Sequence, residues 1–222
     1  FFATMYKFAN KHGVKNILTG GNYSTECIRN PKEWMYFQSD ERQIKDIQKK
    51  FGNINLRRFP LTNIIWHKIF LPYVKGIKVY RLLDYTPYNK EKATQFLVDH
   101  FGYQRYPQKH FESRFTRFYE AYWLPEKFGY DTRKVQFSSL IRTEQMSREE
   151  ALELLKRPAY DQQTINDDKE YIANKLNISI KDLMKYLNAP NKTFRDYKNQ
   201  EFIYDFGAKV LRSFGIEKGG KR

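Results

Sequence analysis

The most constraining feature of the sequence is a short apolar run at residues 14–18 that follows a helix-like segment and leads directly into Thr-Gly-Gly-Asn. Residues 4–12 have the pattern of a helix, and Gly13 is a typical helix end. Open parallel sheets place a ligand-binding loop after a strand in this way. The order helix, strand, glycine loop therefore predicts an α/β domain. Because the chain enters this pattern on a helix, we expect further strands upstream.

The strand-to-helix pattern recurs before a helical region begins. Residues 40–51 form an amphipathic helix pattern, residues 76–83 are rich in β-branched and aromatic residues, and Asn89 can cap a helix that ends at Gly102. Later helices are predicted at four segments: 147–157 with a Ser147/Glu150 capping box, 167–176, 179–187 and 201–214. We therefore predict that residues 1–140 form the second half of a parallel sheet with flanking helices and that residues 141–222 form a helical extension.

Composition excludes several classes of protein. Hydrophobic residues make up 41% and aromatic residues 17% of the 222 residues, which is enough for a packed core. The single cysteine excludes an internal disulfide, and the four histidines lack metal-type spacing. No signal peptide is visible and no apolar stretch is long enough to cross a bilayer, so we expect a cytoplasmic protein. The net charge of +15 predicts attraction to phosphates, nucleic acid or anionic membranes, although a Lys-rich background composition would produce the same value.

The loop after the first predicted strand carries candidate nucleotide-binding residues. Paired glycines let the backbone approach a nucleotide closely, and the following polar side chains offer ligands for ribose, phosphate or metal. These candidates are Gly20, Gly21, Asn22, Thr25 and Glu26. An ordinary tight turn would use the same residues. Cys27 follows the loop and would act as a nucleophile only if a base approached it; otherwise it is a buried apolar side chain.

The second candidate region, residues 109–141, has an unusual density of charge among aromatic residues. Lys109, Glu112 and Thr116 have the spacing of one helical face. The alternative is a solvated face of ion pairs packed on an aromatic ridge. No zinc-protease motif, nucleophile elbow or Walker loop is present.

Four segments together resemble the N-acetyl sugar amidotransferase family: LTGGNYSTE at 18–26, LLDYTPYN at 82–89, KHFESRFTRFYEAYWLPEKFGYDTRKVQFSSLI at 109–141 and MSREEALELLKRPAY at 146–160. Members of this family convert a sugar acetamido group to an acetamidino group in lipopolysaccharide or flagellin-glycan biosynthesis. The resemblance implies a PP-loop (HUP-like) ATP pyrophosphatase fold. The family's Ser-Gly-Gly-x-Asp-Ser loop and its segment with paired cysteines are missing from this sequence. The resemblance therefore implies an amino-terminally truncated fragment that is inactive by itself.

The chemistry implied by the resemblance is activation of the acetamido oxygen by ATP and attack of ammonia on the carbon. Mg²⁺ is expected with the nucleotide, and a separate glutaminase subunit is expected to supply ammonia. Basic side chains would offset the charge that develops on pyrophosphate. The resemblance nominates Arg133 and Lys134 first for this role, then Arg117 and Lys109. It nominates Thr25, Glu26, Glu112 and Asp131 to orient the nucleotide, metal or ammonia.

Two other functions remain open at the level of sequence. A PP-loop tRNA-modifying enzyme would use the same fold, and its thiolating members commonly need several cysteines, whereas this chain has only Cys27. A basic nucleic-acid-binding module would use the positive charge but gives no role to the 109–141 segment. We therefore expect an N-acetylated sugar substrate and no nucleic-acid partner.

Overall fold

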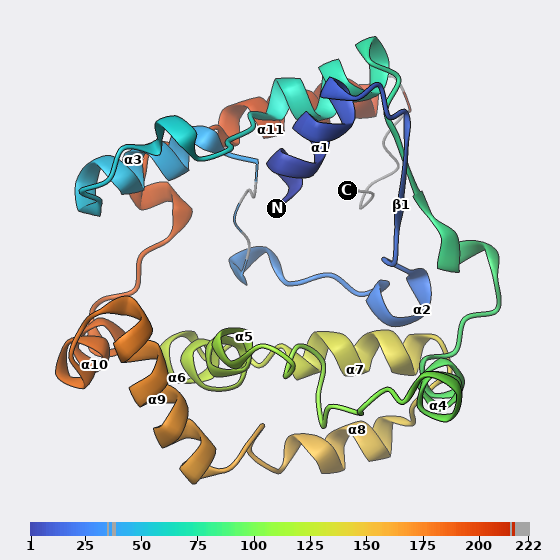
Figure 1. The fold of residues 1–222 in the computed structure, drawn as a ribbon, viewed down its shortest axis with the longest axis vertical. Coiled ribbons are helices and arrows are strands. Elements are labelled where there is room, and N and C mark those ends of the chain that lie inside the picture. The colour runs from blue at the N-terminus through green and yellow to red at the C-terminus, as the bar shows by residue number, and fades with distance from the viewer. Residues whose placement is uncertain (35, 37–38, 214, 216–222) are drawn as a thin grey trace. The chain divides into compact units, whose positions relative to one another are not determined.

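The computed structural model describes residues 1–34, 36, 39–213 and 215, and most of these residues lie in helices (Figure 1). The described residues divide into two compact units. One comprises Phe1–Thr19, Tyr36–Tyr80 and Lys192–Arg222, and the other comprises Gly20–Met35 and Arg81–Asn191. The domain boundary predicted at residue 140 falls inside helix α7 (Arg133–Arg142) and stays a prediction.

The first unit contains helices α1 (Phe2–Lys11), α3 (Glu41–Phe51) and α11 (Glu201–Ser213), together with a π-helix at Trp66–Val74. Strands β1 (Asn16–Thr19) and β2 (Lys78–Arg81) pair in a small two-stranded parallel sheet. The buried core of this unit joins Tyr6 and Ala9 of α1 to Leu71 and Ile77. Short 3₁₀ turns lie at Leu56–Arg58 and Phe194–Asp196.

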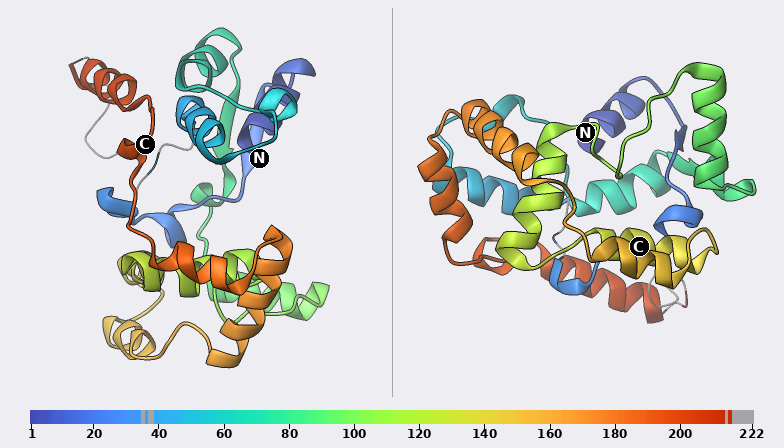
Figure 2. Two further views of the ribbon diagram at one scale, coloured as in Figure 1. Left: turned by 90° about the vertical axis from the view of Figure 1, so that its left-hand side faces the viewer. Right: turned by 90° about the horizontal axis from the view of Figure 1, so that it is seen from below.

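The second unit is helical. Its elements are α2 (Tyr23–Glu26), α4 (Lys90–Phe101), α5 (Arg114–Phe118), a π-helical turn Tyr119–Trp123, α6 (Leu124–Phe128), α7, α8 (Arg148–Leu155), α9 (Gln162–Leu176) and α10 (Ile180–Asn188), with 3₁₀ turns at Lys32–Trp34 and Leu82–Tyr85. The segment from α5 through α6 is continuous and packs on α9 and α10 (Figures 1 and 2). Phe118, Ile172, Ala173 and Leu183 form its buried core.

Most of the predicted helices have a side-chain N-cap at their first turn. Asp40 accepts the backbone N–H of Gln43, Asn89 accepts that of Lys92, and Ser147 and Ser179 do the same for α8 and α10. Helix α9 begins at Gln162 rather than at the predicted residue 167, because Asp161 caps it through the N–H of Thr164. Helix α11 was predicted to reach Phe214, which lies outside the described residues.

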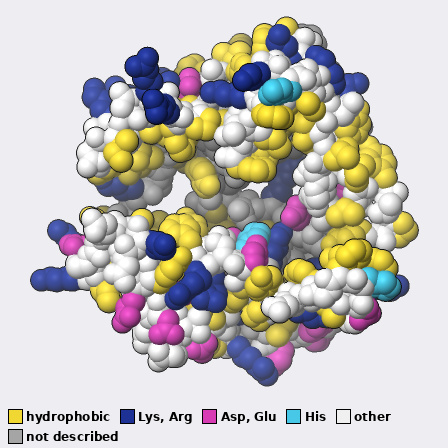
Figure 3. Space-filling model, viewed as in Figure 1, with side chains coloured by type: hydrophobic (Ala, Val, Ile, Leu, Met, Phe, Trp, Pro, Cys, Tyr) yellow, Lys and Arg dark blue, Asp and Glu magenta, His cyan; other side chains and the backbone are white. Residues whose placement is uncertain are grey.

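The mixed α/β character predicted from the sequence is confirmed only in a coarse sense. The described residues contain a two-stranded sheet among many helices, so the PP-loop fold stays a prediction. None of the helices in the described part of the chain is both long enough and apolar enough to cross a bilayer. Lys and Arg side chains are scattered over the visible face rather than gathered in one patch (Figure 3).

Candidate functional site

The glycine loop leads into α2, and α2 packs against α7 in the second unit. Asn22 is 5% exposed and caps α2 by accepting the N–H of Thr25 at 2.8 Å. The carbonyl of Ser24 accepts hydrogen bonds from the Thr143 hydroxyl at 2.7 Å and the Gln145 amide at 3.1 Å. These bonds hold the turn against the residues that directly follow α7. Asn22 therefore has a structural role in the turn, which is the ordinary alternative that the sequence left open for it.

Cys27 lies just beyond this turn and is half-buried. Its thiol is directed at the backbone carbonyl of Ser139, with a distance of 3.7 Å from Sγ to the oxygen. The N–H of the next residue, Ile28, donates to the Ser139 hydroxyl at 3.1 Å. A backbone carbonyl cannot act as a base toward the thiol, so this geometry matches a packing role for Cys27.

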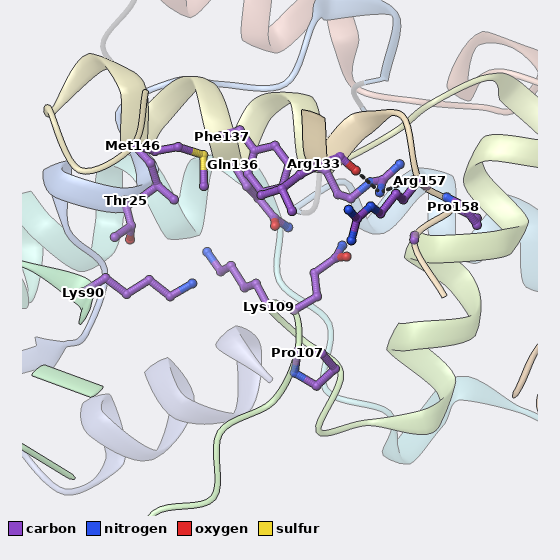
Figure 4. A pocket seen from close by; sticks show the side chains of 14 residues that line it. Thr25, Lys90, Pro107, Lys109, Arg133, Gln136, Phe137, Met146, Arg157 and Pro158 are labelled. Carbon is purple, nitrogen blue, oxygen red and sulfur yellow. Dashed lines mark hydrogen bonds between the residues drawn. The ribbon is translucent and has the colours of Figure 1, made fainter. Parts of the chain in front are cut away.

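A cavity of about 330 Å³ opens between the turn of α2, the start of α4, the 107–109 loop, α7 and the end of α8 (Figure 4). All of these segments belong to the second unit. The lining residues are Thr25, Lys90, Pro107, Gln108, Lys109, Arg133, Gln136, Phe137, Leu140, Met146, Leu154, Arg157, Pro158 and Ala159. The cavity thus combines an apolar surface with four basic side chains and two amides, as ligand pockets commonly do.

Positive charge dominates the cavity. Lys109 Nζ is paired with Glu26 Oε1 at 2.8 Å. The ammonium of Lys90 reaches toward that of Lys109 from the opposite side of the cavity (Figure 4). Desolvation by surrounding protein atoms, and then the like charge of Lys109, lower the pKa of Lys90. Among the described residues, neither Lys90 nor Arg157 forms an ion pair.

Arg133 lines the same cavity but its guanidinium is bound to protein. The residue is 8% exposed, and its Nη2 donates to Asp131 Oδ2 at 2.7 Å while Nε donates to both carboxylate oxygens. Its Nη1 donates to the carbonyls of Leu154 and Arg157 at 3.4 and 2.9 Å. Arg133 therefore ties the start of α7 to the end of α8. Lys134 is exposed and does not line the cavity.

The predicted helical face of Lys109, Glu112 and Thr116 is wrong. Helix α5 begins only at Arg114, with Ser113 as its cap, so Lys109 and Glu112 lie in a turn before it. His110 adopts a left-handed φ of 71°, which is incompatible with a helix through this segment. Its Nδ1 is 2.9 Å from Glu120 Oε1, and the hydrogen bond to Glu120 raises the pKa of His110. Glu112 is exposed and lies outside the cavity lining.

Arg117 lies on α5 and binds α9. The carboxylate of Asp168, which is completely buried, accepts hydrogen bonds from Nε and Nη2 of Arg117, each at 2.8 Å, and from Nε of Arg114 at 2.8 Å. The same bonds raise the pKa of Arg117. The guanidinium of Arg114 also lies over the ring of Tyr171. This pairing fits the alternative of ion pairs on an aromatic ridge.

The structure thus brings only some of the sequence-predicted residues together. Thr25, Lys109 and Arg133 line the cavity, and Glu26 borders it through its ion pair with Lys109. Gly20, Gly21, Asn22, Glu112, Arg117 and Lys134 do not line it. Sequence reasoning missed Lys90, Gln136 and Arg157. Arg157 lies within segment 146–160 and Lys90 directly follows segment 82–89, so those segments were a usable signal for this neighbourhood.

Comparison with known protein families identifies part of the chain. Residues 112–211 match the family model described as the C-terminal domain of WbpG-like LPS biosynthesis proteins. The match includes α7 and α8, which form one wall of the cavity. The match is consistent with the family resemblance seen in the sequence. No curated protein and no solved structure matches the chain significantly.

Proposed function

We propose, from the match of residues 112–211 to the WbpG-like C-terminal domain model, that this protein acts in LPS biosynthesis and catalyses ATP-dependent amidotransfer to an N-acetylated sugar. In this reaction ATP adenylates the acetamido oxygen and releases pyrophosphate. Ammonia then attacks the carbon, and the oxygen leaves with AMP, so that an acetamidino group remains. The family match is the observation that carries the proposal.

The cavity supports this proposal because the reaction uses phosphate-bearing substrates. Lys90, Lys109 and Arg157 present positive charge to the cavity, and ammonium and guanidinium groups bind phosphate oxygens through charge-assisted hydrogen bonds. Phe137 and Leu140 supply an apolar wall to the same cavity. We assign Arg133 to positioning, because its donors hold Asp131 and two backbone carbonyls.

Mg²⁺ is expected with ATP, but the described residues do not provide a site for it. In this part of the chain no group of three or more His, Cys, Asp or Glu side chains is arranged to hold a metal ion. Glu26 and Asp131, whose ion-pair partners line the cavity, are both paired with basic side chains. Mg²⁺ usually keeps several waters and binds one or two carboxylates together with phosphates, so these paired carboxylates fit it poorly.

Ammonia is mostly protonated at neutral pH and is then a poor nucleophile. We therefore propose that a glutaminase partner supplies unprotonated ammonia. The sequence carries no recognisable glutaminase triad. Such a partner should stimulate the reaction when glutamine supplies the nitrogen, but not when ammonium is saturating.

The test is turnover with ATP, Mg²⁺, a nucleotide-linked N-acetyl sugar and ammonium. Since the sequence contains no Ser-Gly-Gly-x-Asp-Ser loop, we compare the 222-residue chain with the same chain joined to a family segment that carries this loop. The expected result is sugar-dependent release of AMP and pyrophosphate, with a product in which NH replaces O, from the joined protein only. Absence of this product from both proteins would refute the amidotransfer. tRNA binding that falls steeply with salt would instead favour a nucleic-acid function.

A further inference from the structure

The charges around the cavity do not balance. Lys90, Lys109 and Arg157 face it, and Glu26 neutralises only Lys109. Arg133 and Asp131 form a pair that adds no net charge. The other two positive charges, on Lys90 and Arg157, form no ion pair among the described residues and lie beside an apolar wall.

We propose that this cavity binds the diphosphate of a diphosphate-linked N-acetylated sugar, with Lys90 and Arg157 on the phosphates. The inference rests on the proposed function, because it names the form in which the sugar substrate arrives. A diphosphate diester carries one negative charge on each phosphate, which matches the two uncompensated cations. A nucleotide carrier and a polyprenyl lipid carrier share this chemistry.

The triphosphate of ATP fits the same cavity less well. It carries more negative charge than the two cations compensate, and it normally enters with Mg²⁺. The carboxylates beside the cavity, Glu26 and Asp131, are held by Lys109 and Arg133 at 2.8 and 2.7 Å. Binding Mg²⁺ there would break an ion pair, whereas a diphosphate diester needs no metal ion.

The remaining walls suit a sugar. The side-chain amides of Gln108 and Gln136 line the cavity and can each donate to and accept from hydroxyl or acetamido groups. Phe137 and Leu140 of α7 and Met146 offer apolar surface to the face of a sugar ring or the acetamido methyl. Polar groups placed at a few positions on a mostly apolar lining give orientation and specificity.

Lys90 occupies a position that helix formation alone would disfavour. It is the first residue of α4, where the positive end of the helix dipole repels a cation. Its ammonium also faces that of Lys109, which disfavours its charged form. A bound phosphate group between the two ammoniums would relieve both effects. Replacement of Lys90 should therefore weaken anion binding without weakening the fold.

The experiment is calorimetric titration of the 222-residue chain with UDP-N-acetylglucosamine and with MgATP. The test variants are Lys90→Gln and Arg157→Gln. The matched controls are Lys92→Gln, in the same first turn of α4, and Lys156→Gln, whose ammonium pairs with Glu153 and does not line the cavity. Thermal melting of each variant by circular dichroism reports on folding.

We expect UDP-N-acetylglucosamine to bind more tightly than MgATP. Each test variant should weaken that binding about tenfold, the size of one charged hydrogen bond. The controls should change it by about twofold or less, as expected for exposed charges. Tighter binding of MgATP, or equal losses in test and control variants, would overturn the inference.

A second arm uses vesicles that contain polyprenyl-diphosphate N-acetylglucosamine, compared with vesicles that lack it. Binding that requires this lipid and is lost in Lys90→Gln supports the diphosphate site and identifies the lipid as the carrier. Binding of neither sugar form overturns the inference. Sugar binding without amidotransfer by the joined protein would contradict the proposed function alone. Conversely, turnover in which Lys90→Gln leaves the KM for sugar unchanged would contradict this inference alone.

Discussion

Asp168 is the residue whose replacement should damage the second unit most clearly. Its carboxylate is completely buried on α9 and accepts three hydrogen bonds of 2.8 Å from Arg114 and Arg117 of α5. Loss of one partner from a buried ion pair typically costs about 3–5 kcal/mol. The side chains of Arg114 and Arg117 are 43% and 22% exposed, so both guanidiniums can regain water when the carboxylate is removed. Asparagine also keeps one acceptor oxygen.

We therefore expect Asp168→Asn to lower the free energy of unfolding by about 2–3 kcal/mol, which corresponds to a fall of about 5–10 °C in Tm for a chain of this length. The assay is thermal melting followed by circular dichroism. The adjacent Asp167 provides the control, because its carboxylate is exposed and, within the described part of the chain, accepts only from Gln163 on the same helix. Asp167→Asn should change stability by less than about 0.5 kcal/mol.

The same experiment separates a structural role for Arg117 from a catalytic one. If the guanidinium acts through Asp168, Arg117→Ala should destabilise the chain to a similar degree, and its effect should not add to that of Asp168→Asn. A melting curve for Asp168→Asn that coincides with that of Asp167→Asn would refute the reasoning. So would full additivity of the two changes.

Three further predictions concern side chains that bind acceptors elsewhere in the fold. Arg133→Ala should lower the free energy of unfolding by about 2–4 kcal/mol because it removes a buried guanidinium that binds Asp131 and two backbone carbonyls, whereas Lys134→Ala should leave the melting curve unchanged. The hydrogen bond to Glu120 raises the pKa of His110, so protonated His110 stabilises the folded state fully below its unfolded pKa of 6.5. This stabilisation is lost as the pH rises through the higher pKa of the folded state. The Tm difference between wild type and Glu120→Gln should therefore shrink as the pH rises through that range. Lys127→Met should lower stability by about 1–3 kcal/mol in chemical denaturation, because the ammonium donates to three carbonyls at the end of α10.

The sequence predicted helix starts well where a side chain caps the backbone. Asp40, Asn89, Ser147 and Ser179 each accept an N–H within the first turn, and this interaction depends only on residues three positions apart. The sequence did not predict the break before α5. There the charge spacing favoured a helix, but the left-handed backbone of His110 and the Ser113 cap prevent it.

The cavity was only partly predictable because its walls come from separate segments. Thr25, Lys109 and Arg133 attracted attention through local sequence patterns, and the packing of α2 on α7 brings the first and last of them into one neighbourhood. Lys90 appeared in sequence as an ordinary residue after a helix cap, and Arg157 as an ordinary residue after a helix. Their place at the cavity depends on contacts between segments far apart in the chain, which no local pattern contains.

Pairing, rather than clustering in sequence, separates the basic residues of this chain into two kinds. Arg133 and Arg117 stand in the charge-dense 109–141 segment, and each is bound to a carboxylate. Asp168 joins Arg117 of α5 to α9, whereas Arg133 also donates to two carbonyls at the end of α8. Lys90 and Arg157 stand apart in sequence, line one cavity and have no carboxylate partner in the described part of the chain. A guanidinium bound to a buried carboxylate must break that pair before it can bind phosphate, whereas an unpaired cation at a cavity has only water to displace. In a chain with a net charge of +15, the unpaired cations are therefore the ones to which phosphate binding is most reasonably assigned.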